Sequence, residues 1–259
     1  MNEVPCGYDW PRSHAQRIDR LSEAVTVIRL LWTKEFVTFA GEHFRLHKAN
    51  LYDKPPSPVP VHLSGFGPRA AALAGEIADT FMTVGPVEAS RVKDVLFPAV
   101  ERGARSCGRT IQDLEKSLVL GLAFDSDREK AIDSLLPWRG SLLPIFADSE
   151  VHDPRKIEEN GNRVGRDSLA RYFVVATSSE DVISAVERHI KLGFDHIALA
   201  FSGDLPAFLK AAKKEVLPYF RGEYGDRRLK RAGYRGNYHY DNLVQVMEAK
   251  GLVHKVETA

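Results

Sequence analysis

The sequence lacks the features that mark several classes of protein. It has only two cysteines, Cys6 and Cys107, among 259 residues, which argues against a disulfide framework and favours free thiols in a reducing compartment. No apolar run reaches the roughly 20 residues that a membrane-spanning helix needs. The first residues also lack a basic segment followed by an apolar core. We therefore expect a cytoplasmic protein with no membrane partner.

An excess of charge of one sign is also lacking. Thirty-six Lys and Arg side chains balance 35 Asp and Glu, so the formal net charge is +1 and gives no general attraction to nucleic acid. The sequence contains no Gly-x-Ser-x-Gly motif, so nothing in it suggests a nucleophile for acyl transfer. His43 and His47 are four residues apart, but no carboxylate or thiolate completes a metal site. We expect no metal ion, and the composition, 44% hydrophobic and 27% charged, is that of a soluble globular protein.

The chain alternates between helical and strand patterns after an N-terminal helix and hairpin. Residues 14–33 carry an apolar stripe at spacings of three and four, formed by Ile18, Leu21, Val25, Ile28 and Trp32. A β-hairpin is expected around Ala40-Gly41. Further strands are expected at 59–64, 79–84, 116–124 and 195–201. Further helices are expected at 69–77, 87–106, 127–136, 178–193 and 205–220, and residues 138–168 are expected to be an irregular insertion or lid.

Successive strand–helix units indicate an α/β fold, either a TIM-like barrel or a doubly wound sheet. Only four strands look parallel and buried, whereas a closed (β/α)8 barrel has eight. The opening, "MNEVPCGYDWP", reads as a loop that follows a strand. We therefore predict a TIM-barrel type fold that is N-terminally truncated, a partial barrel over residues 1–220. A basic extension with a short helix at 240–250 is expected over 221–259.

Three stretches, "RIDRLSEAVTVIRLLWTKEFVTFAGEHFRL", "PVPVHLSGFGPRAAALAGEIADTFMTVG" and "VVATSSEDVISAVERHIKLGFDHIALAF", resemble the luciferase-like monooxygenase superfamily. The similarity is greatest to its coenzyme F420-dependent branch, which includes glucose-6-phosphate dehydrogenases. The resemblance implies a barrel that transfers hydride between a small organic substrate and F420. Two alternatives stay open: an FMN-dependent monooxygenase, and an incomplete fragment or half of a split enzyme that acts as a binding subunit. The expected protein partner is either another copy of the chain, in a homo-oligomer, or a missing N-terminal half.

The turn between the strand at 59–64 and its helix is the best local candidate for a binding site. Glycines let the backbone approach a ligand, and the helix start offers N–H groups to a phosphate. The turn lacks the G-x-G-x-x-G dinucleotide pattern, and a plain βα turn is the alternative. The resemblance implies cofactor contacts here, at the end of the next strand, and at the start of the chain. These residues are Ser64, Gly65, Phe66, Gly67, Pro68, Thr83, Val84 and Asn2. By the same resemblance, Glu3 is the candidate catalytic carboxylate.

Other residues bear on the substrate and on the tail. The resemblance places a phosphate-binding cation where this sequence has Val87, which favours a neutral hydride donor such as an alcohol over a sugar phosphate. Arg105 and Arg109 flank Cys107, an arrangement that can lower the pKa of a thiol, but an ordinary free thiol is the favoured interpretation. The tail mixes arginines and tyrosines. It is interpreted mainly as a solvated connector, with nucleic acid or the polyglutamate of F420 as alternatives.

Overall fold

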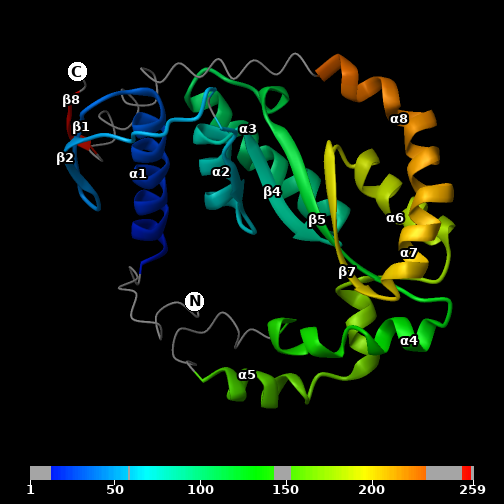
Figure 1. The fold of residues 1–259 in the computed structure, drawn as a ribbon. Helices are drawn as coiled ribbons and strands as arrows, with labels where there is room; N and C mark the ends of the chain where they lie inside the picture. Colours follow the sequence, from blue (N-terminus) through cyan, green and yellow to red (C-terminus); the bar gives the residue numbers. More distant parts are fainter. Residues whose placement is uncertain (1–12, 58, 143–152, 232–252, 258–259) are drawn as a thin grey trace. The chain divides into compact units, whose positions relative to one another are not determined.

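The computed structural model describes residues 13–57, 59–142, 153–231 and 253–257. The chain forms two compact units. Figure 1 labels their helices and strands. Unit 1 comprises Met1–Trp10, Val84–Glu88 and Ser117–Tyr234. Unit 2 comprises Pro11–Thr83, Ala89–Lys116 and Arg235–Ala259. Among the described residues, no helix combines the length and apolar character needed to cross a membrane.

Unit 2 begins with a long helix beside a small antiparallel sheet. Helix α1 (His14–Thr33) precedes strands β1 (Val37–Gly41) and β2 (Arg45–Ala49), which form the expected hairpin. Strand β8 (Val253–Glu257), near the end of the chain, pairs antiparallel with the other edge of β1, which gives the order β2-β1-β8. Val27 and Leu30 of α1 pack with Val37 and Phe39 of β1.

The predicted apolar stripe does not coincide with the face of α1 that is buried. Leu21 and Ile28 are 37% and 42% exposed, whereas Glu23 and Arg29 are buried. The buried carboxylate of Glu23 accepts three backbone N–H hydrogen bonds, from Glu42, His43 and Phe44, and so holds the turn of the hairpin. Buried Arg29 pairs with Asp79 at 2.9 Å. Polar partners from outside the helix, which periodicity does not reveal, decide which face is buried.

Unit 2 also contains a parallel βαβ motif. Strand β3 (His62–Ser64) is followed by helix α2 (Pro68–Ile77) and strand β4 (Thr80–Gly85), with Leu63 opposite Phe81 in parallel register. The last two residues of β4 belong to unit 1. A six-residue π-helical segment, η2 (Arg91–Leu96), then continues into helix α3 (Phe97–Ser106), and the short helix η3 (Ile111–Asp113) follows. Strand β3 is shorter than the strand predicted at 59–64.

Unit 1 is built on the long strand β5 (Glu115–Phe124), of which Ser117 onward lies in this unit. Strand β7 (His196–Gly203) runs parallel to it over eight paired positions, and β6 (Val174–Ala176) pairs with its last three residues. Helices α6 (Ser179–Lys191), α7 (Leu205–Ala211) and α8 (Leu217–Arg231) follow β6 and β7 in the chain, with a π-helical segment, η7 (Ala212–Val216), between α7 and α8. Alternating parallel strands and helices confirm the α/β fold class.

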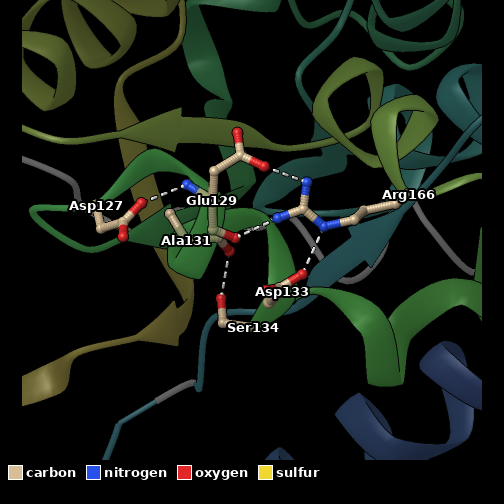
Figure 2. A network of polar contacts seen from close by, with 6 residues as sticks. All are labelled: Asp127, Glu129, Ala131, Asp133, Ser134 and Arg166. Carbon is tan, nitrogen blue, oxygen red and sulfur yellow. Dashed lines mark hydrogen bonds and ion pairs between the residues drawn. The ribbon is translucent and has the colours of Figure 1, made fainter.

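The segment at 138–168 is not irregular where the structure describes it, which corrects the prediction. After α4 (Arg128–Asp133) come the 3-10 helix η4 (Leu136–Leu142), the helix α5 (Pro154–Gly161) and the 3-10 helix η6 (Arg166–Arg171). Figure 2 shows how η6 is attached to α4: the Arg166 guanidinium contacts the carboxylates of Glu129 and Asp133, each at 2.5 Å, and the Glu129 carbonyl at 2.7 Å. The hydrogen bond from Arg166 holds the carboxyl pKa of Asp133 below its usual value.

Two further differences concern a missed strand and the end of a helix. Strand β6 was missed, because three residues give no alternating pattern to detect. The helix expected to end at 220 continues beyond its π-helical segment as α8 to Arg231, so the basic segment after 220 begins as a helix. The short helix predicted at 240–250 lies outside the described residues.

Candidate functional site: the turn after strand β3

The turn of residues 64–68 is folded tightly against its own helix. The Gly65 N–H donates to the Met82 carbonyl of β4 at 2.9 Å, which ties the turn to the neighbouring strand. A Cβ atom on Gly65 would lie 3.0 Å from the Ala71 nitrogen and 3.2 Å from the Ala70 Cβ. Only glycine therefore fits here without displacement of the first turn of α2.

The start of α2 is open on the side of Gly67. Gly67 is the N-cap residue, makes no side-chain cap hydrogen bond, and has nothing within 4 Å of a Cβ placed on it. Pro68 occupies the first turn of the helix, and that turn contains no acidic residue. Because first-turn N–H groups have no acceptor within the helix and lie at its positive end, this geometry suits an anion. The turn thus has the physical features that a phosphate-binding turn requires.

Phe66 and Arg91 contact each other at the turn. Phe66 is 61% exposed, and its backbone carbonyl accepts a hydrogen bond from the Arg91 guanidinium. Arg91 was not among the predicted site residues, because nothing local in the sequence relates it to a turn 25 residues earlier. Its only signal was its place in the helix after the next strand.

The other predicted site residues are at the end of β4 and at the start of the chain. Thr83, one residue beyond the partner of Gly65, is 2% exposed, whereas Val84 is 46% exposed, as expected for neighbours that face opposite sides of β4. The prediction that a ligand reaches the Thr83 hydroxyl stays a prediction. Asn2 and Glu3 lie outside the described residues. Among the described residues, no group of three or more His, Cys, Asp and Glu side chains is arranged to hold a metal ion.

The favoured interpretation of Cys107, an ordinary free thiol, agrees with the structure, and the alternative of a lowered pKa is wrong. Burial raises the pKa of the Cys107 thiol, and the charge of Arg109 opposes this effect only in part. The sulfur lies 3.3 Å from the Glu76 carbonyl, and the Arg109 guanidinium donates to the Ala78 carbonyl. Because desolvation outweighs the nearby cation, the thiol is less reactive than an exposed one.

Unit 1 presents a second region, at the carboxyl end of β7, which the sequence did not suggest. The indole N–H of Trp138 donates to the Ser202 hydroxyl at 3.0 Å, and its ring lies 6.5 Å from that of Phe173. In register, the small residues Gly121 and Ala200 lie opposite each other on this face of β5 and β7. Trp138 is 47% exposed, so an aromatic surface borders the strand ends.

Comparisons with known proteins agree with this architecture. Residues 4–196 match the family described as luciferase-like monooxygenase. The chain is 34% identical to an F420-dependent glucose-6-phosphate dehydrogenase of Nakamurella multipartita over 226 residues, which are 87% of this chain and 66% of that protein. An enzyme of the same name from Intrasporangium calvum is 33% identical, over 86% of this chain and 67% of its own length.

Solved structures give the same picture. An F420-dependent secondary alcohol dehydrogenase in complex with an F420–acetone adduct matches with a TM-score of 0.75 and 37% identity, over 83% of this chain and 65% of that one. The tetrahydromethanopterin reductase of Methanopyrus kandleri, at 17% identity and a TM-score of 0.63, shares the fold. This chain spans about two thirds of the length of the proteins that it matches. From the family match and these identities, the chain belongs to the luciferase-like monooxygenase family.

Proposed function

We propose that this chain is an oxidoreductase that transfers hydride between a small organic substrate and coenzyme F420, with the turn of residues 64–68 holding the phosphodiester arm of the coenzyme. The observation that carries the proposal is the open, uncapped start of α2 at Gly67, beside the tightly folded Gly65. Relatives at 30% to 37% identity bear names of F420-dependent dehydrogenases, which supports the choice of this coenzyme.

The residues of the turn fit the group that they would hold. The phosphodiester is an anion, and the start of α2 offers backbone N–H groups and no carboxylate. The exposed Phe66 ring adds apolar surface next to these polar groups, and exposed Arg69 adds a positive charge in the first helical turn. When bound, the coenzyme supplies the hydride acceptor. The protein residues orient it and exclude water from it.

We propose a neutral hydride donor, such as a secondary alcohol, as the substrate class. Val87 provides no charge at the position where the resemblance places a phosphate-binding cation. A site for a phosphate dianion that lacks a cation loses charge-assisted hydrogen bonds, which are about twice as strong as neutral ones. The name of the secondary alcohol dehydrogenase structure supports the same class.

Titration of the purified chain with F420 and with FMN, followed by deazaflavin or flavin fluorescence, tests the proposal. We expect F420 to bind at least tenfold more tightly than FMN. Reduction of F420 should then be measured with propan-2-ol and with glucose 6-phosphate, and we expect the alcohol to be the better substrate. Tighter binding of FMN, or no binding of F420, would refute the assignment of the coenzyme.

A further inference from the structure

Arg91 links the turn of residues 64–68 to the next strand–helix unit. It is the first residue of η2, and its guanidinium donates to the Phe66 carbonyl; both residues belong to unit 2. The two residues are separated by 25 positions, so the bond depends on the tertiary fold. π-helical turns are rare and are often found at functional sites. The contact is therefore a candidate for a role in the site.

The hydrogen bond from Arg91 to the Phe66 carbonyl fixes the orientation of the whole Phe66–Gly67 peptide. The Phe66–Gly67 peptide is planar and trans, so its carbonyl and its N–H point in opposite directions. When Arg91 holds the Phe66 carbonyl, it also sets the direction of the Gly67 N–H, which points away from Arg91. Rotation of this peptide changes ψ of Phe66 and φ of Gly67, and because Gly67 has no Cβ, such a rotation would otherwise cost little. Arg91 thus removes freedom at Gly67, the N-cap position of α2.

We propose that Arg91 is a positioning residue for coenzyme binding, because its bond to Phe66 keeps the Gly67 N–H in the orientation that receives the phosphodiester arm. This inference rests on the proposed function of the turn. A turn that populates the competent orientation only part of the time binds its ligand more weakly by that fraction. Arg91 acts through the Phe66 peptide and does not need to touch the coenzyme.

The guanidinium has a second effect, which must be separated from the first. Its positive charge near the turn attracts an anion whatever the orientation of the peptide. That attraction is screened by salt, since the Debye length falls to ~3 Å at about 1 M. The orientation of a peptide held by a direct hydrogen bond depends much less on salt. Salt dependence therefore distinguishes positioning from simple attraction.

The experiment compares wild type, Arg91→Ala, Arg91→Lys and the control Arg102→Ala, which removes an exposed arginine from helix α3 of the same unit. Two ligands are titrated: F420, and the deazaflavin chromophore without its phosphodiester arm. We expect Arg91→Ala to raise the dissociation constant for F420 by ~3- to 10-fold, the range that one hydrogen bond contributes. The increase should persist at about 1 M salt. Lys, which keeps a donor and the charge, should recover part of the loss.

The ligand without the arm should bind wild type and Arg91→Ala equally, and Arg102→Ala should leave both affinities unchanged. If wild type binds F420 and Arg91→Ala binds it equally well, or if both ligands weaken together, the positioning role is refuted and the proposed function stands. A loss that disappears in high salt would show attraction by charge and would also refute positioning. If wild type does not bind F420 at all, the proposed function itself fails. Thermal unfolding of each variant confirms that it is folded.

Discussion

Gly67 is the residue at which the nature of the ligand is most directly tested. Its φ of −132° is accessible to any residue, and nothing lies within 4 Å of an added Cβ, so a side chain is tolerated here. Asp and Asn are both good N-cap residues, and both should keep or slightly raise stability. Asp adds a negative charge where we place the phosphodiester. We predict that Gly67→Asp weakens F420 binding at least tenfold relative to Gly67→Asn.

The pair of variants isolates the charge, because Asp and Asn have the same shape. The measurement is the dissociation constant for F420, with urea unfolding to compare stabilities. Equal affinities for the two variants would mean that no anionic group binds beside Gly67.

His189 should make the stability of the protein depend on pH. Its ring is buried, and its Nδ1 lies 2.8 Å from the Ala185 carbonyl. Burial lowers the pKa of His189, since the charged imidazolium loses its hydration. Because the unfolded chain then binds a proton that the folded chain does not, the free energy of unfolding falls as the pH drops below about 6.5, the usual value for His.

Replacement of His189 by Leu removes this titration. Urea unfolding at pH 7.5 and pH 5.5 should show a smaller loss of stability in His189→Leu than in wild type. His47→Gln, at an exposed position of β2, is the control and should keep the wild-type pH dependence. An unchanged dependence in His189→Leu would contradict the prediction.

At the scale of elements, α2 and α3 approach each other through two glycines. A Cβ on Gly103 would lie 1.8 Å from the Ala72 carbonyl oxygen, and one on Gly75 would lie 2.0 Å from that of Val100. Gly103→Ala therefore pushes the backbones of α2 and α3 apart. We predict that it lowers the free energy of unfolding by about 3 kcal/mol or more. Gly222→Ala in α8 meets nothing within 4 Å and should stabilise the chain by up to ~1 kcal/mol.

Urea unfolding followed by circular dichroism measures both variants. The matched substitution at Gly222 shows the intrinsic preference of a helix for Ala over Gly. A Gly103→Ala variant as stable as wild type would mean that the helices separate at no cost, contrary to the packing described.

The elements that the sequence predicted best are those whose pattern is local. The bounds predicted for α1, 14–33, match those observed, and the helix predicted at 178–193 is α6, with Ser178 as its N-cap residue. The buried face of α1 was mispredicted because Glu23 and Arg29 take partners from elsewhere in unit 2. The short helices after α4 were missed for a related reason: the attachment of η6 to α4 depends on Arg166, 33 residues from Asp133.

The candidate site divides in the same way. Its glycine turn is visible in the sequence, because Gly65 and Gly67 stand between a strand and a helix with Pro in its first turn. The contact of Arg91 with Phe66 is not visible, because only the placement of successive strand–helix units brings the two residues together. The glycines that shape the turn are thus encoded next to it. Arg91, whose hydrogen bond holds the turn, is encoded after the following strand, β4.

At the scale of the whole molecule, the exposed side of β7 bears on how chains associate. Among the described strands, β7 pairs with β5 alone, so its other edge has no described strand beside it. Ala198 and Ala200 of β7 are exposed and carry no charge. An edge strand of eight residues without Lys, Arg, Asp or Glu is a template for pairing with another strand, and proteins often protect such edges with lysine. We therefore predict that the chain self-associates as its concentration rises.

Light scattering after size exclusion, over a tenfold range of concentration, measures this association. Ala198→Lys places a charge on β7 and should shift the chain toward the monomer, because pairing would bury that charge. Gln112→Lys adds the same charge at an exposed position of η3, outside the described strands, and should leave association unchanged. A chain that stays monomeric throughout, or an equal effect of both lysines, would show that the edge of β7 does not mediate contacts between copies. A selective effect of Ala198→Lys would instead identify β7 as the strand through which copies pair.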